Sequence, residues 1–167
     1  IKANYSRTRQ YMQLAQNSTA GTPLDIWFPA SPNVKPQIAD QFALGYFRNF
    51  KDNMLETSVE VYYKNMKNSI DFKDFAQVLL NAELEGELRF GKSWSYGAEF
   101  LVRKNAGKLT GWISYTYSRT FRKFEDINSG KTYPAPYDKP HDISIVLSYD
   151  VSPRLEVSAN WLYATGR

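Results

Sequence analysis

The sequence predicts an all-β protein, an antiparallel up-and-down meander of about seven strands that forms a fragment of a large transmembrane β-barrel. Three observations predict it: apolar residues recur at every second position, short and long connections alternate along the chain, and 16% of the residues are aromatic. No run of 18 or more apolar residues is present. That absence excludes a transmembrane helix but not a barrel strand, because only every second residue of such a strand faces lipid.

The alternation of apolar and polar residues is clearest in residues 55–64. Apolar or β-branched residues occupy the odd positions there, and Glu56, Glu60 and Lys64 are among the even ones. A helix, with its period of 3.6, cannot produce this pattern over ten residues. The pattern recurs in six further stretches, so about seven strands are expected; the others are residues 4–14, 41–46, 96–103, 109–118, 142–150 and 154–163.

The connections between these strands differ in length in a regular way. Short turns are predicted at residues 50–53, 105–107 and 151–153, and long connections at residues 18–37, 72–93 and 122–139. Membrane barrels have short turns on one side and longer loops on the other, whereas a soluble sandwich of Greek keys mixes its loop lengths. In the second long connection Phe75, Val78, Leu79 and Ala82 have helical spacing, so either a short helix or a bent extension of the strands is expected there.

The composition excludes several classes of function. Cysteine is absent, which excludes disulfides, thiolate metal sites and cysteine nucleophiles. The single histidine, His141, excludes a histidine-rich metal site, and we expect no cofactor. The formal net charge is +4 without a polybasic run, so no nucleic-acid partner is expected.

His141 stands beside Asp138, Asp142 and Ser144, which are the residue types of a hydrolase triad. In an alternating strand Asp142 and Ser144 point to one face and His141 points to the other, so the three side chains cannot meet. We therefore expect that the protein is not an enzyme, and we interpret His141 as a residue at the point where a loop enters its strand.

Seven short segments, each of them ordinary β-hairpin sequence, become specific through their order and spacing. They are residues 45–53 (GYFRNFKDN), 60–64 (EVYYK), 95–100 (SYGAEF), 103–107 (RKNAG), 111–118 (GWISYTYS), 137–142 (YDKPHD) and 161–166 (WLYATG). In this arrangement the stretch from residue 39 to residue 167 resembles the C-terminal barrel region of TonB-dependent receptors of the Bacteroidetes type.

The resemblance implies a plugged barrel of about 22 strands in the outer membrane of a Gram-negative bacterium. Such a protein imports a bulky, scarce nutrient, for example a siderophore or an oligosaccharide. The implied partners are outer-membrane lipid and, through a plug domain, the TonB motor complex; a surface lipoprotein partner is left open. The plug domain and the remaining strands are expected to lie outside these 167 residues.

Six aromatic residues in or beside the long connections are candidates for substrate contact, because exposed rings at a barrel mouth can stack on a sugar or a catechol. Loop packing explains them equally well. The six are Trp27, Phe28, Trp94, Phe121, Phe124 and Tyr133. On the polar strand faces, Glu56, Glu60, Glu99 and Arg103 are expected to contact one another, other residues of the lumen or the plug rather than a substrate.

A second hypothesis is a soluble β-sheet carbohydrate-binding module. In such a module the apolar faces of the strands would pack together in a sealed core, whereas in a membrane barrel they would face lipid. The two hypotheses can be separated by Ile113→Lys and Ser114→Lys, which change neighbouring residues on opposite faces. In a barrel the first should impair membrane assembly and the second should be tolerated.

Overall fold

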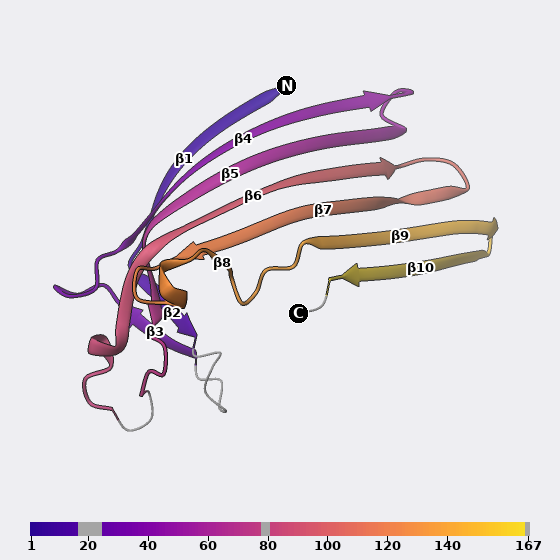
Figure 1. Ribbon diagram of the computed structural model, residues 1–167. Coiled ribbons are helices and arrows are strands. Elements are labelled where there is room, and N and C mark those ends of the chain that lie inside the picture. The colour runs from indigo at the N-terminus through magenta and orange to yellow at the C-terminus, as the bar shows by residue number, and fades with distance from the viewer. Residues whose placement is uncertain (17–24, 78–80, 166–167) are drawn as a thin grey trace.

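The computed structural model describes residues 1–16, 25–77 and 81–165. Seven strands follow one another in one antiparallel sheet in the order β1-β4-β5-β6-β7-β9-β10, which confirms the predicted all-β meander. The sheet is curved and open, with β1 and β10 at its edges (Figure 1). The bounds are β1 (Lys2–Gln10), β4 (Gln37–Phe50), β5 (Leu55–Phe72), β6 (Leu88–Lys104), β7 (Leu109–Lys123), β9 (His141–Ser152) and β10 (Leu155–Ala164).

Several strands are longer than their alternating sequence stretches. β5 has 18 residues and β6 has 17, whereas a tilted strand needs roughly 9–11 residues to cross the hydrocarbon layer of a membrane. The strand predicted for residues 4–14 is divided in two, because the chain leaves the large sheet after Gln10. Its second part, β2 (Met12–Gln16), pairs instead with β3 (Asp25–Pro29) in a separate two-stranded sheet.

The three predicted short turns all lie at one end of the sheet (Figure 1). Between β4 and β5, Lys51, Asp52 and Asn53 adopt φ angles of 51°, 54° and 67°. This is the left-handed region, which Asn and Asp enter more readily than other residues with a side chain. Between β6 and β7, Gly107 has a φ of 94°, which only glycine adopts without strain.

The long connections gather at the opposite end, which we call the long-loop end (Figure 1). They contain the β2–β3 hairpin, the 3₁₀ turns η1 (Leu84–Glu87) and η2 (Asn128–Gly130), and the short strand β8 (Tyr133–Pro134), which pairs with β7. Of the predicted helix, Val78 and Leu79 lie outside the described residues, and Phe75 has a non-helical φ of 60°. No helix among the described residues is long and apolar enough to cross a membrane.

The register of the sheet separates its side chains into two faces. On the apolar face, Val59 is paired with Tyr46 on one side and Phe100 on the other. On the polar face, Glu60 is paired with Gly45 and Glu99. The large side chains of the apolar face remain exposed: Phe42, Leu44, Val61, Phe100, Ile113, Leu147, Val157 and Trp161 are among them. Since a sealed core would have buried these residues, the structure does not support the soluble module.

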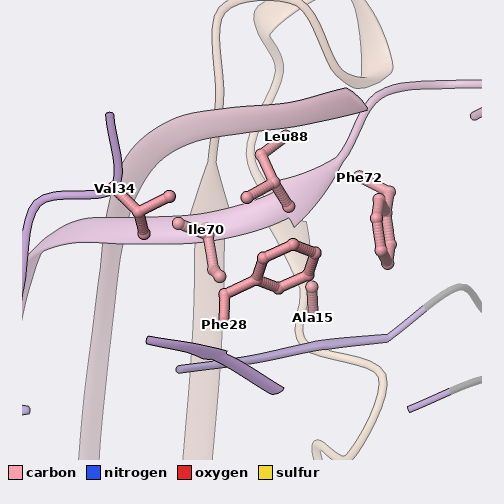
Figure 2. Close-up of a cluster of buried hydrophobic side chains, with 6 residues drawn as sticks. All are labelled: Ala15, Phe28, Val34, Ile70, Phe72 and Leu88. Carbon is pink, nitrogen blue, oxygen red and sulfur yellow. The ribbon is translucent and has the colours of Figure 1, made fainter. Parts of the chain in front are cut away.

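Buried apolar side chains are instead found at the long-loop end. One cluster consists of Ala15, Phe28, Val34, Ile70, Phe72 and Leu88, where the β2–β3 hairpin packs against the ends of β5 and β6 (Figure 2). The rings of Phe28 and Phe72 meet edge to face with their centroids 6.0 Å apart, a favourable arrangement for an aromatic pair. This cluster fixes the hairpin against the sheet.

Candidate binding pocket at the long-loop end of the sheet

A pocket of about 260 Å³ opens on the polar face where the sheet meets the long connections. The register brings its walls together, because Ser93 on β6 is paired with Met66 on β5 and with Arg122 on β7. We call it the polar-face pocket. Its lining is mostly polar: Gln10, Gln13, Gln37, Lys64, Ser69, Ser93, Arg122 and Tyr137, with Leu14, Met66 and Ile70.

Arg122 is held in place at one side of this pocket by a largely buried ion pair. Its Nη1 donates to Oδ2 of Asp71 over 3.0 Å, and the two side chains are only 10% and 13% exposed. The hydroxyl of Tyr133 donates to the same carboxylate oxygen over 2.9 Å. Burial and the charge of Asp71 raise the pKa of Tyr133, so that its hydroxyl remains a donor. The ring of Tyr137 lies 5.4 Å from the guanidinium of Arg122.

A chain of small polar groups forms the other side of the pocket. The amide of Gln37 donates to the hydroxyl of Ser69 over 2.9 Å, and the hydroxyl of Ser93 donates to Ser69 over the same distance. Ser69 and Ser93 are both buried, so these hydrogen bonds satisfy groups that would otherwise be costly to remove from water. The Nε2 of Gln13 donates to the backbone oxygen of Lys35, which anchors the β2 side of the pocket.

This combination of groups suits the binding of a polar molecule. Amides, hydroxyls and the two cations Lys64 and Arg122 can hydrogen-bond a polyhydroxylated or anionic molecule. No group of three or more His, Asp or Glu side chains among the described residues is arranged to hold a metal ion. The arrangement therefore fits recognition of a polar ligand.

The sequence did not reveal the polar-face pocket because a β-bulge in β5 changes the alternation. The register shifts between Lys67 and Ser69, and Asn68 has a φ of 57°. After this bulge the odd positions, Ser69 and Asp71, continue the polar face that the even positions formed before it. The sequence signal that could have indicated this bulge is Asn68, which interrupts the alternation within the strand.

Two of the six predicted aromatic contacts are buried. Phe28 is 6% exposed in the cluster of Figure 2. Phe124 is 1% exposed, and its ring lies over Gly91, where an added Cβ would come within 2.5 Å of it. The side chains of both residues pack within the protein and are not presented to a ligand in this conformation.

The remaining four aromatic residues occupy three different environments. Trp94 and Phe121 stack with centroids 5.9 Å apart, and their register places them on the apolar face, away from the pocket. Trp27 is 56% exposed on β3. Tyr133 is paired with Arg122 and lies on the polar face beside the pocket. The structure thus brings only Tyr133 to the side chains that line this pocket.

The triad residue types are separated as the alternation predicts. Asp142 and Ser144 are paired with Thr116 and Ser114 on the polar face, and His141 is paired with Tyr117 on the apolar face. The Nδ1 of His141 lies 2.9 Å from the hydroxyl of Tyr115. Asp138 accepts hydrogen bonds from Arg119 Nε and from the backbone of Thr120, at 2.9 and 2.7 Å. His141 and Asp138 thus have hydrogen-bond partners other than each other.

The four charged residues of the polar face form one weak ion pair. Arg103 Nη1 lies 3.9 Å from Oε2 of Glu56, and both side chains are at least a third exposed. Glu60 and Glu99 face each other directly in the register. These residues lie toward the short turns and do not line the polar-face pocket.

The family comparison agrees with the two-faced sheet. The family described as "TonB dependent receptor-like, beta-barrel" matches residues 1–167. No curated protein and no solved structure matched the chain. An open antiparallel meander with an exposed apolar face is the form that a segment of barrel wall takes, and barrels of this kind lie in the outer membrane of Gram-negative bacteria. The chain belongs to the TonB-dependent receptor β-barrel family.

Proposed function

We propose that this chain forms part of the wall of an outer-membrane transporter that imports a bulky, scarce nutrient such as a siderophore or an oligosaccharide. Family membership indicates outer-membrane transport that depends on TonB. Barrels of this membrane have short periplasmic turns and longer extracellular loops. In that orientation the long-loop end is extracellular and the polar face lines the lumen.

The observation that carries this proposal is the two-faced sheet, with one apolar face whose large side chains are not covered by other parts of the chain and one polar face that ends in a pocket. The apolar face meets lipid. The polar-face pocket lies where a substrate would first enter the barrel from outside, and we propose that it contacts the substrate through Lys64, Gln37, Arg122 and Tyr137. Tyr133 is retained as a substrate contact beside them. We propose no catalytic step for any of these residues.

The resemblance of the seven segments supports a finer placement. We propose that the chain is the C-terminal portion of a barrel of the Bacteroidetes type, and that a plug domain elsewhere in the receptor contacts TonB. A surface lipoprotein partner would cover the long-loop end. Phe75 is 94% exposed. A cysteine introduced in its place and used for cross-linking in intact cells would capture such a partner. Cross-linking to lipid alone would leave this element of the proposal without support.

Uptake by a strain that carries the intact receptor tests the substrate pocket. The strain would be grown on a panel of ferric catecholate chelates and of oligosaccharides as the sole source of iron or carbon. For a compound whose uptake requires the receptor, Lys64→Ala with Tyr137→Ala should raise the half-saturation concentration about tenfold, as expected for the loss of one or two polar contacts. The membrane level of the receptor should remain unchanged.

A matched control is available at the other end of the same face. Arg103→Ala with Trp112→Ala also removes a cation and an aromatic ring from opposed strand positions, but far from the pocket. This control should leave the half-saturation concentration within about twofold of the wild type. Equal effects of both pairs would contradict the pocket, and uptake that persists without TonB would contradict the transport mechanism.

A further inference from the structure

A row of basic residues crosses the apolar face near the long-loop end. Lys67 on β5 is paired with Lys92 on β6, and Lys92 is paired in turn with Lys123 on β7. On the other side Lys67 is paired with Ile38, and Ile38 with Arg9. Cross-strand partners point to the same face of a sheet. Arg9, Lys67, Lys92 and Lys123 therefore lie in one row across the face, with Ile38 between Arg9 and the three lysines, and we call these four residues the basic row.

The cations of the basic row form no close ion pair within the part of the chain that the structure describes. Asp40 is the acidic neighbour of Lys67 on this face, but its carboxylate is already bound by Arg7 and Tyr5. None of its four cations forms an ion pair or a side-chain hydrogen bond there, although six other basic residues do form ion pairs. All four side chains are exposed. Like charges placed directly opposite each other destabilise a sheet, so three adjacent lysines at one register call for an anion outside the chain.

The position of the basic row indicates where that anion lies. Four residues closer to the short turns on β1, β4, β5 and β6, the register joins a row of exposed aromatic residues: Tyr5, Phe42, Tyr63 and Tyr96. On β7 the corresponding position is Arg119, which is paired with Asp138. Tyr side chains mark the boundary between the hydrocarbon layer and the lipid headgroups. We call this row of aromatic residues the aromatic belt. Because barrel strands are tilted, the basic row runs obliquely to the plane of the membrane, and it lies on the headgroup side of the aromatic belt.

We propose that the basic row binds the phosphate groups of anionic lipids in the outer leaflet of the membrane. Neighbouring strands are about 4.8 Å apart, so the α-carbons of the three lysines span about 10 Å. Their flexible ammonium groups can bracket one phosphorylated headgroup with charge-assisted hydrogen bonds. The site lies on the lipid side of the wall and is separate from the polar-face pocket. It rests on the membrane orientation and not on the identity of the nutrient.

Lipid binding by the intact receptor in neutral detergent tests this site. The probes are bis-phosphorylated lipid A and the same lipid after removal of its phosphates, and bound lipid is counted by native mass spectrometry. We expect the phosphorylated form to bind at least tenfold more tightly. Lys67→Gln, Lys92→Gln and Lys123→Gln together should reduce that preference at least tenfold, since each cation near an anionic lipid surface contributes to binding.

The control removes three exposed cations from the short turns instead, with Lys51→Gln, Lys108→Gln and Arg154→Gln. It changes the net charge equally and should keep the preference for the phosphorylated lipid. Migration of the unheated protein in gels reports correct assembly of each variant. If the triple variant of the basic row fails to assemble, Lys92→Gln alone should weaken binding severalfold, because Lys92 lies between the other two lysines.

Three outcomes would overturn the proposal. The wild type could bind both lipids equally, the control could lose the preference as fully as the basic-row variant, or inorganic phosphate could displace the lipid at equal phosphate concentration. Nutrient uptake is not measured in this experiment, so its result is independent of the substrate pocket.

Discussion

Between the short turns and the aromatic belt the sheet carries its apolar side chains on an open face, whereas at the long-loop end such side chains are buried against one another. Val61 and Ile113 are each 45% exposed, but Phe28 and Val34 are 6% and 1% exposed. The same chain therefore follows two packing rules. In the first region the apolar side chains contact lipid. At the long-loop end the surroundings are water, so the apolar side chains must pack against one another.

This difference extends to what holds each region together. Along the meander, cross-strand backbone hydrogen bonds join every neighbouring pair of strands. In lipid an unpaired backbone group is very costly, so the ladder itself is the main stabilising element there. At the long-loop end, stability comes from the small apolar cluster around Phe28 and from the buried pair of Arg122 and Asp71. A substitution should thus be damaging for a different reason in each region.

The largest effect is expected from Phe28→Ala in the intact receptor. Removal of a buried aromatic side chain leaves a cavity and should cost about 3–5 kcal/mol of local stability. Because the cluster holds the β2–β3 hairpin and not the barrel ladder, the hairpin should open while the barrel still assembles. Hydrogen exchange of residues 12–16 and 26–29 would measure the opening. Trp27→Ala removes the exposed neighbour of Phe28 and should change hydrogen exchange little. If Trp27→Ala and Phe28→Ala increased exchange equally, burial in the apolar cluster would not be what holds the hairpin.

The next effect concerns the face that meets lipid. Ile113→Lys should cost about 2–4 kcal/mol near the midplane of the membrane and lower the yield of assembled barrel. Ser114→Lys places the same charge on the polar face and should assemble normally. Heat-dependent migration in gels and the amount of receptor in purified outer membranes provide the measurement. Similar yields for both variants would contradict the lipid-facing assignment.

A smaller effect is expected from the buried ion pair at the pocket. Asp71→Asn removes the charge that faces Arg122 and should cost about 1.5–3 kcal/mol locally, as for other hydrogen bonds to charged groups. Asp126→Asn alters the exposed pair with Arg89, in which the carboxylate is 70% exposed, and should cost less than about 1 kcal/mol. Limited proteolysis of the β7–β9 connection would rank the two variants, and cleavage should be faster in Asp71→Asn. Faster cleavage in Asp126→Asn would show that burial does not decide how much an ion pair contributes to local stability.

The smallest effect is expected for the lumen pair of Glu56 and Arg103. Their atoms are 3.9 Å apart and both side chains are well exposed, so Arg103→Gln should change stability by about 0.2–1 kcal/mol at most. Thermal unfolding of the assembled barrel at low and high salt is the measurement. A large loss at both salt concentrations would mean that the plug or another wall residue depends on Arg103.

Much of the meander can be predicted from the sequence, because local alternation reports it directly. The order of strands, the three short turns and the opposite faces of His141 and Ser144 all follow from period two and from turn residues such as Asn53 and Gly107. The site is far less predictable. Trp94 and Phe121 belong to the apolar face and Phe28 and Phe124 are buried, although all four had the aromatic character expected of ligand contacts.

What the sequence determined alone is therefore the property that repeats along each strand: which residues share a face and where the chain reverses. What only the tertiary structure decided is which residues from distant strands meet. The bulge at Asn68 brings Ser69 and Asp71 onto the polar face beside Ser93 and Arg122, and the register joins Lys67, Lys92 and Lys123 into one row. Both results depend on pairing between strands, and a local pattern carries no information about the partner it will pair with.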